Sequence, residues 1–124
     1  MVLMCDFNGY IIPEIVKKRP VMIISPNHLN RPGLYTVVPL STTVPNPICD
    51  YHYKLKGNPI PGESAEVWAK CDLVASVAFE RLDRIKIARG TYRVGYVSME
   101  QVREVRLCVA RSIGVPVEPT TPNV

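Results

Sequence analysis

The sequence predicts a mainly β fold in a single domain, with one α-helix near the C-terminus. The chain has 124 residues, which is the size of one ordinary domain, and 47% of them are hydrophobic. Twelve prolines and seven glycines divide it into short segments that are rich in β-branched and aromatic residues. We expect one folded domain over residues 1–114 and a flexible tail over residues 115–124, which contain three prolines.

Continuous apolar runs predict the first strands. Residues 2–5, 21–24 and 35–40 are such runs, as is typical of fully buried strands. The segments between them include Asn8-Gly9 and residues 27–33, which have the composition of turns. We therefore expect three antiparallel strands that form the first part of a barrel.

Prolines and glycines interrupt the middle of the chain. Residues 44–64 contain four prolines and two glycines around a polar stretch, which predicts one short strand or hairpin because proline cannot donate to a ladder. Residues 66–72 predict another strand with Val67, Ala69 and Cys71 on one face. Residues 73–87 are expected to continue as one or two strands around a turn.

The segment that begins at Ser98 predicts the helix. Ser98 can act as the N-cap, and Gln101 stands three residues later, as in a capping box. Gly114 is a residue that commonly ends a helix. Between these ends, one apolar stripe has helical spacing and consists of Val102, Val105, Val109 and Ile113.

The four cysteines and the apolar runs exclude several classes of protein. Cys5, Cys49, Cys71 and Cys108 form no C-x-x-C pair, which argues against a zinc site and a disulfide scaffold, so we expect reduced, mostly buried thiols. No metal or other cofactor is expected. The sequence has no apolar run near the roughly 20 residues of a membrane helix and no signal-peptide pattern, so we expect a cytosolic protein.

The positive charge of the chain is concentrated in its second half. The formal net charge is +4. Residues 70–111 contain nine Lys or Arg against five Asp or Glu, whereas residues 1–69 contain six against five. This asymmetry suggests an acidic partner, although a net charge of this size also serves solubility.

Several segments, in this order along the chain, resemble the MazF/PemK family of toxins. Lys18-Arg19-Pro20 opens one apolar run, Ser41-Thr42 closes the next, Ala69-Lys70-Cys71-Asp72 follows, and the capped helix comes last. The resemblance covers roughly residues 2–114. It implies an SH3-like small barrel of the CcdB/MazF/PemK type with a C-terminal helix.

The resemblance also implies a function. Members of this family are metal-independent endoribonucleases, or mRNA interferases, that cut single-stranded RNA and are held inactive by an acidic segment of a cognate antitoxin. They work as homodimers whose active sites lie at or near the subunit interface. Cleavage by the substrate's own 2′-hydroxyl leaves a 2′,3′-cyclic phosphate and a 5′-hydroxyl.

This chemistry needs charge stabilisation at phosphorus, a base and an acid, for which the motifs offer four catalytic candidates. Arg19 can hold a phosphate through two parallel hydrogen bonds; the alternative is a solvated arginine before a strand. Ser41 can donate a hydrogen bond, although Ser and Thr are also ordinary turn residues. Lys70 and Asp72, two apart on one predicted strand, share a face, where they serve either catalysis or an exposed ion pair.

A second group of residues is suited to binding RNA around the site. Aromatic side chains stack on unpaired bases, and lysines contact phosphates; a structural role for the tyrosines is the alternative. The candidates are Tyr51, His52, Tyr53 and Lys54, together with Lys18, Thr42 and Glu14. Some relatives carry a histidine within residues 10–18, where this chain has none and Glu14 is the nearest substitute. His28 is a weaker acid-base candidate.

Two other functions stay open on the sequence alone. A barrel of the same fold can poison gyrase without cutting RNA, as CcdB does, and would not need the four catalytic candidates in phosphate-directed geometry. A catalytically inactive nucleic-acid or protein adaptor of this fold belongs to the same alternative. A structural adaptor that binds proline-rich peptides is a further one, and it would need an exposed aromatic groove.

Overall fold

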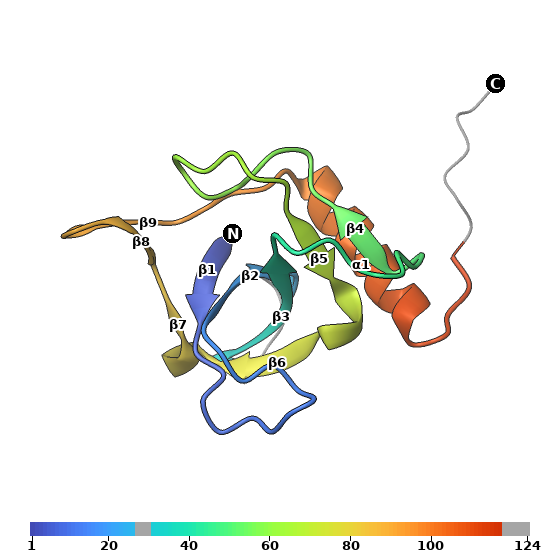
Figure 1. Ribbon diagram of the computed structural model, residues 1–124. Helices are drawn as coiled ribbons and strands as arrows, with labels where there is room; N and C mark the ends of the chain where they lie inside the picture. Colours follow the sequence, from blue (N-terminus) through green and yellow to red (C-terminus); the bar gives the residue numbers. More distant parts are fainter. Residues whose placement is uncertain (27–30, 118–124) are drawn as a thin grey trace.

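The computed structural model describes residues 1–26 and 31–117. Its strands and helices follow the chain in an order that ends with the one α-helix (Figure 1). The elements are β1 (Val2–Cys5), β2 (Arg19–Ile23), β3 (Leu34–Ser41), β4 (His52–Lys54), β5 (Trp68–Lys70), η1 (Cys71–Leu73), β6 (Ala75–Ala78), η2 (Phe79–Arg81), β7 (Leu82–Asp83), β8 (Ile85–Ala88), β9 (Thr91–Arg93) and α1 (Met99–Ser112).

The main sheet is antiparallel and strongly curled (Figure 1). Its strand order is β4-β5-β3-β2-β1-β7, and β6 also pairs with β3. Strand β3 uses one edge for two partners, since residues 34–37 pair with β6 and residues 40–41 with β5. The prediction of a mainly β fold with one C-terminal helix is confirmed. Among the described residues, the recorded strand pairings do not close the barrel between β6 and β7.

The apolar runs are continuous because both faces of the sheet are buried. On one face, Met22 and Val38 belong to the cluster that packs against α1. On the other face, Val21 and Val37 pack with Phe7 in a second cluster. Neighbouring residues of a strand point to opposite faces, so a strand that is covered on both sides has apolar residues at every position.

The helix begins and ends as the sequence predicts. Ser98 Oγ accepts a hydrogen bond from the Gln101 backbone N–H at 3.2 Å, and Gly114 follows the helix with a φ of 92°. The Gln101 side chain does not close the capping box, because its Oε1 accepts from the Lys56 backbone N–H at 2.8 Å. Ile113, predicted in the apolar stripe, is 71% exposed, and Cys108 is buried instead.

The predicted strand over residues 66–72 is wrong at its C-terminal end. Strand β5 stops at Lys70, and the chain turns into η1 at Cys71. The turn brings Cys71 beneath α1, where it is buried and where Ser112 Oγ lies 3.5 Å from its carbonyl oxygen. Lys70 and Asp72 therefore do not share the face of one strand.

The other sequence predictions concern shorter elements. The single short strand in residues 44–64 is confirmed as β4, whereas residues 73–87 contain β6, η2, β7 and the start of β8 rather than one or two strands. The four cysteines are free thiols, three of them buried, as predicted. No helix in the described part of the chain is both long and apolar enough to cross a membrane. His28 and the last seven residues of the predicted tail lie outside the described residues.

Candidate functional site

A cavity of about 270 Å³ opens where β2 begins and β3 ends. Arg19 is the first residue of β2, Ser41 is the last residue of β3, and both line the cavity. The two strands are antiparallel, and their ladder ends with Val21 opposite Pro39, two residues short of Arg19 on β2 and of Ser41 on β3. Because both residues line the cavity, one small group can contact both side chains.

Ser41 is held so that its hydroxyl group can still donate. Its Oγ accepts a hydrogen bond from the Thr43 backbone N–H at 3.0 Å. This bond fixes the oxygen through one lone pair and leaves the O–H proton available for a ligand. Thr42 is exposed and lines the same cavity. The end of β3 thus presents hydroxyl groups next to the guanidinium of Arg19.

Two charged residues from distant parts of the chain complete the lining. Glu63 comes from the loop between β4 and β5, and Lys86 comes from β8. Asn58 braces that loop, because its Oδ1 accepts from the Ile60 backbone N–H at 2.9 Å and its Nδ2 donates to the Ala65 carbonyl at 3.0 Å. The carboxylate is therefore carried on a braced loop.

The charged side chains that line the cavity form no ion pairs with one another in the described part of the chain. Within residues 1–26 and 31–117, the ion pairs formed are Lys54–Glu66 at 2.9 Å and Lys56–Glu100 at 3.3 Å. Arg19, Lys86 and Glu63 are exposed. The cavity thus combines two cations, hydroxyl donors and one carboxylate that can exchange a proton, which is a set suited to a phosphodiester.

Lys70 and Asp72 do not line this cavity. Strand β5 leads away from it: Val67, just before the strand, lines the cavity, and Lys70 at its other end lies opposite His52 of β4. Asp72 comes after the strand, in η1. The chain from Val67 to Asp72 spans about 14 Å at the rises of a strand and a 3₁₀-helix. The structure brings Arg19 and Ser41 together but places this second pair elsewhere on the same protomer.

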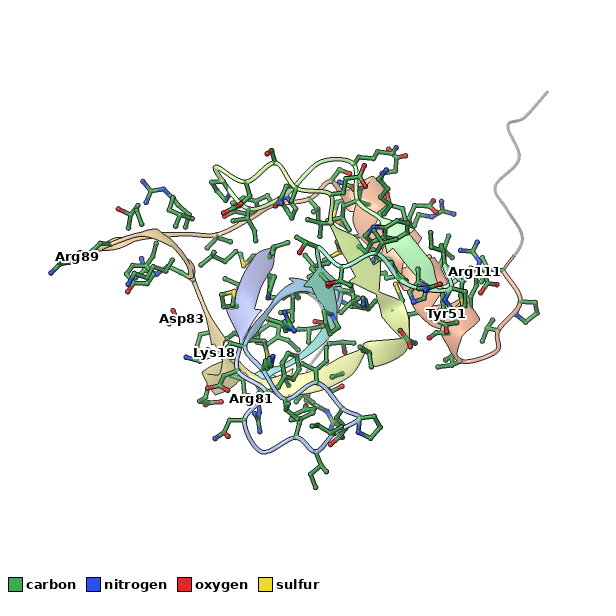
Figure 2. The ribbon with its side chains drawn as sticks, in the orientation of Figure 1. Lys18, Tyr51, Arg81, Asp83, Arg89 and Arg111 are labelled. Carbon is green, nitrogen blue, oxygen red and sulfur yellow. The ribbon has the colours of Figure 1, made fainter. Side chains whose placement is uncertain are left out.

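Asp72 lies instead near Tyr51. The pKa of Tyr51 is raised mainly by a hydrogen bond with Cys49, and the negative charge of Asp72 is among the smaller contributions. Figure 2 shows Tyr51 beside Arg111 at the side of the molecule where α1 ends, across the view from Arg89 at the tip of the β8–β9 hairpin.

The remaining predicted RNA contacts do not line the cavity, and all but Lys18 have structural partners. His52 Nδ1 accepts from the Cys49 backbone N–H at 2.9 Å, and Tyr53 packs against the core under α1. Lys54 pairs with Glu66. Glu14 Oε1 accepts from the Ile11 backbone N–H at 2.7 Å in the loop between β1 and β2. Lys18 is exposed and directly precedes Arg19.

Glu63 and Lys86 were missed by sequence reasoning. The only signal for Lys86 is the excess of cations in the second half of the chain. Nothing in the sequence around Glu63 points to a site, because its loop reaches the cavity through tertiary packing. Within the described residues, no three His, Cys, Asp or Glu side chains gather closely enough to hold a metal ion.

Comparison with known proteins agrees with this fold. The chain is similar to toxin MazF-mt6 of Mycobacterium tuberculosis, with a TM-score of 0.62, 17% identity, and coverage of 94% of this chain and 100% of that one. It is also similar to MazF (Form-I) from Deinococcus radiodurans, with a TM-score of 0.65, 18% identity, and coverage of 91% and 92%. A third structure is an endoribonuclease in complex with its cognate antitoxin from Mycobacterial species, with a TM-score of 0.59, 20% identity, and coverage of 94% and 92%.

Sequence comparison identifies the family directly. No curated protein sequence matches the chain. The family model for the PemK-like, MazF-like toxin of type II toxin-antitoxin system, however, matches residues 1–113. The match covers almost the whole chain, including both strand ends at the cavity. This chain therefore belongs to the PemK-like, MazF-like toxin family of type II toxin-antitoxin systems.

Proposed function

We propose that this protein cuts single-stranded RNA as the endoribonuclease toxin of a toxin-antitoxin pair. The observation that carries the proposal is that Arg19 and Ser41 line one cavity together with Lys86 and Glu63. A pocket for an apolar ligand would not need two cations that form no ion pair within residues 1–26 and 31–117. The membership of the family and the endoribonuclease among the similar structures support the same activity.

The proposed reaction is attack by a ribose 2′-hydroxyl on the adjacent phosphorus. The O2′–P bond forms and the P–O5′ bond breaks, which leaves a 2′,3′-cyclic phosphate and a 5′-hydroxyl. Arg19 binds the non-bridging oxygens through its planar guanidinium, and Ser41 donates a further hydrogen bond to them. Both interactions strengthen as negative charge develops on these oxygens.

Two protons move during this reaction. Glu63 takes the proton of the 2′-hydroxyl, and Lys86 donates one to the departing 5′-oxygen or stabilises its charge. Because the protein supplies the positive charge through Arg19 and Lys86, we expect cleavage without added metal.

Lys70 and Asp72 belong to the proposal only as parts of a composite site. They would have to approach the Arg19 and Ser41 pair from a second protomer, because within one protomer they lie away from the cavity. A homodimer is likewise proposed, as is inhibition by an acidic antitoxin segment that occupies the cationic cavity. A similar structure in complex with its cognate antitoxin supports the second of these proposals.

Replacing Arg19 tests the activity. Purified protein is incubated with mixed-sequence single-stranded RNA in excess EDTA, and the measurement is repeated with Arg19→Ala and with Arg103→Ala, an exposed arginine on α1. We expect cleavage that survives chelation, falls roughly 100-fold or more in Arg19→Ala, and is unchanged in Arg103→Ala. Arg19 is exposed, so its loss should change the free energy of unfolding by less than about 1 kcal/mol.

Three results would contradict the proposal: no cutting by the wild type, cutting that requires a metal, or equal activity of both variants. Inhibition of gyrase without any cutting would favour the alternative that CcdB represents.

Two carboxylate variants separate the single-protomer site from the composite one. If Glu63 is the base, Glu63→Gln lowers the cleavage rate about 100-fold or more, and Asp72→Asn leaves it within a factor of about two. The reverse result would remove Glu63 from the mechanism and assign the proton transfer to Asp72 of a second protomer. Single-turnover rates at saturating RNA make this comparison independent of binding.

A further inference from the structure

The β8–β9 hairpin is an arm that extends from the body of the protein (Figure 1). Strands β8 and β9 pair with each other as a separate two-stranded sheet, and Gly90 turns the chain between them with a φ of 74°. Residues 84–99 contain four Lys or Arg and no Asp or Glu. The cations are Arg84, Lys86, Arg89 and Arg93, and all four are exposed.

One face of this arm combines positive charge with an aromatic ring. Lys86 lies directly opposite Tyr92 in the β8–β9 register. The Arg84 guanidinium carbon lies 5.3 Å from the centre of the same ring. Tyr92 is 37% exposed although two cations flank it. A base that stacks on such a ring brings its phosphates within reach of the cations.

The base of the arm forms part of the cavity wall. Ile85 is buried in the main core and anchors the hairpin, and residues 85–87 line the cavity together with Arg19. From Lys86 to Arg89, at the tip in Figure 2, the strand rise gives a reach of about 10 Å. Positive charge therefore continues from the cavity to the end of the arm.

The charges on the arm have no acidic partner in the described structure. The ion pairs formed among residues 1–26 and 31–117 involve Lys54 and Lys56 only, and neither lies on the hairpin. Cations that are held close together repel one another, and a polyanion relieves this repulsion. The distal positions Arg89 and Arg93 contribute nothing to the core, so structure alone does not require them.

We propose that the β8–β9 hairpin binds the single-stranded RNA substrate beyond the cleaved bond, with its cations on successive phosphates and Tyr92 stacked on a base. This inference rests on the proposed function, because it takes the cavity as the place of cleavage. An acidic polypeptide would satisfy the charges, but it would not use the ring between Arg84 and Lys86. The continuity with the cavity also favours the strand that is cut there.

The contribution of each cation follows from counterion release. Each phosphate contact with a single strand adds about 0.7 to the slope of log K against log salt. At a salt concentration of about 0.1 M, one contact is therefore worth about fivefold in affinity. Removing two cations should weaken binding about 25-fold and reduce the slope by about 1.4.

The test compares Arg84→Ala/Arg89→Ala with Arg31→Ala/Arg103→Ala, which removes two exposed arginines elsewhere. The probe is a mixed-sequence 2′-O-methyl oligoribonucleotide, which lacks the attacking hydroxyl, longer than the roughly 16 nucleotides of a large single-strand site. Fluorescence anisotropy over a salt series gives affinity and slope. We expect the 25-fold loss and the smaller slope only in the hairpin variant, and near-complete recovery in Arg84→Lys/Arg89→Lys.

Several results would overturn the assignment. These are an unchanged affinity, equal losses in both double variants, or a hairpin variant that loses affinity for polyglutamate and not for RNA. A change in oligomeric mass by light scattering would also overturn it, because the hairpin would then serve a subunit interface. If the wild type binds the probe but cuts no RNA, the proposed activity is wrong, and the hairpin can still be an RNA-binding surface. If the wild type cuts RNA and the hairpin variant binds the probe normally, the proposed activity stands and the role of the hairpin is wrong.

Discussion

Arg19 can be identified as a functional residue because the packing of the fold does not require it. Its side chain is exposed at the first position of β2, so packing does not require an arginine there. It lines a cavity together with Ser41, however, whose oxygen is fixed by the Thr43 backbone N–H. A guanidinium fork beside a fixed hydroxyl group can bind the oxygens of a phosphate group.

In contrast to the exposed Arg19, Cys5 is a reactive group that is buried in the core. It is fully buried, and this burial raises the pKa of its thiol from 9.0 to about 11, with Arg81 opposing and Asp6 adding to the shift. A buried thiol behaves as a small apolar side chain. The position therefore stabilises the fold only while the thiol keeps its proton.

We predict that the protein loses stability in alkali through Cys5. Between pH 9 and 11 the unfolded chain has lost this proton and the folded chain has not, so the unfolded state is favoured as pH rises. The loss is at most roughly 2–3 kcal/mol, at about 1.4 kcal/mol per pKa unit. Urea unfolding across this pH range measures it.

Cys5→Ala should flatten this alkaline decline, and Cys49→Ala, at a half-buried position, should not. Cys71, whose pKa is also raised by its hydrogen bond to Cys108 and by burial, contributes equally in both variants. The idea fails if Cys5→Ala and wild type decline in parallel.

At the scale of elements, the sequence predicts individual strands and the helix, but it does not predict which of them come into contact. The strands that carry Arg19 and Ser41 could be predicted because two-sided burial leaves continuous apolar runs. The turn at Cys71 could not, because it depends on packing under α1, about 35 residues away in sequence. The positions of Glu63 and Lys86 depend in the same way on how a loop and a hairpin fold back onto the sheet.

The N-terminus of α1 allows a quantitative test of the N-cap that the sequence predicts at Ser98. Ser98→Ala removes the 3.2 Å bond to the Gln101 backbone N–H and should lower the free energy of unfolding by about 1 kcal/mol. Ser98→Thr, which keeps an acceptor oxygen, should retain most of that stability, and Ser64→Ala in an exposed loop should change little. Thermal or urea unfolding distinguishes the three; equal losses in the alanine and threonine variants would argue against a capping role.

At the scale of the whole molecule, Gly95 joins three parts of the chain. Its backbone exchanges two hydrogen bonds with Val2 of β1, at 2.7 and 3.0 Å. It also lies against the loop between β4 and β5, where a Cβ at residue 95 would stand 2.6 Å from the Pro59 carbonyl oxygen. Pro59 lines the cavity. The packing of the hairpin's C-terminal end is thus coupled to the shape of the candidate site.

Gly95→Ala should therefore affect both stability and cleavage. The added methyl group overpacks a backbone junction, at a cost of roughly 1–3 kcal/mol, and relief of the clash moves the loop that carries Pro59 and Glu63. We expect a lower single-turnover cleavage rate even at temperatures where the variant is fully folded. Gly114→Ala is the matched control: its φ of +92° makes alanine strained, at about 1–2 kcal/mol, but its Cβ meets nothing within 4 Å. That control should lose stability and keep its cleavage rate. If the two variants lose cleavage in proportion to their stability, the junction at Gly95 does not shape the site.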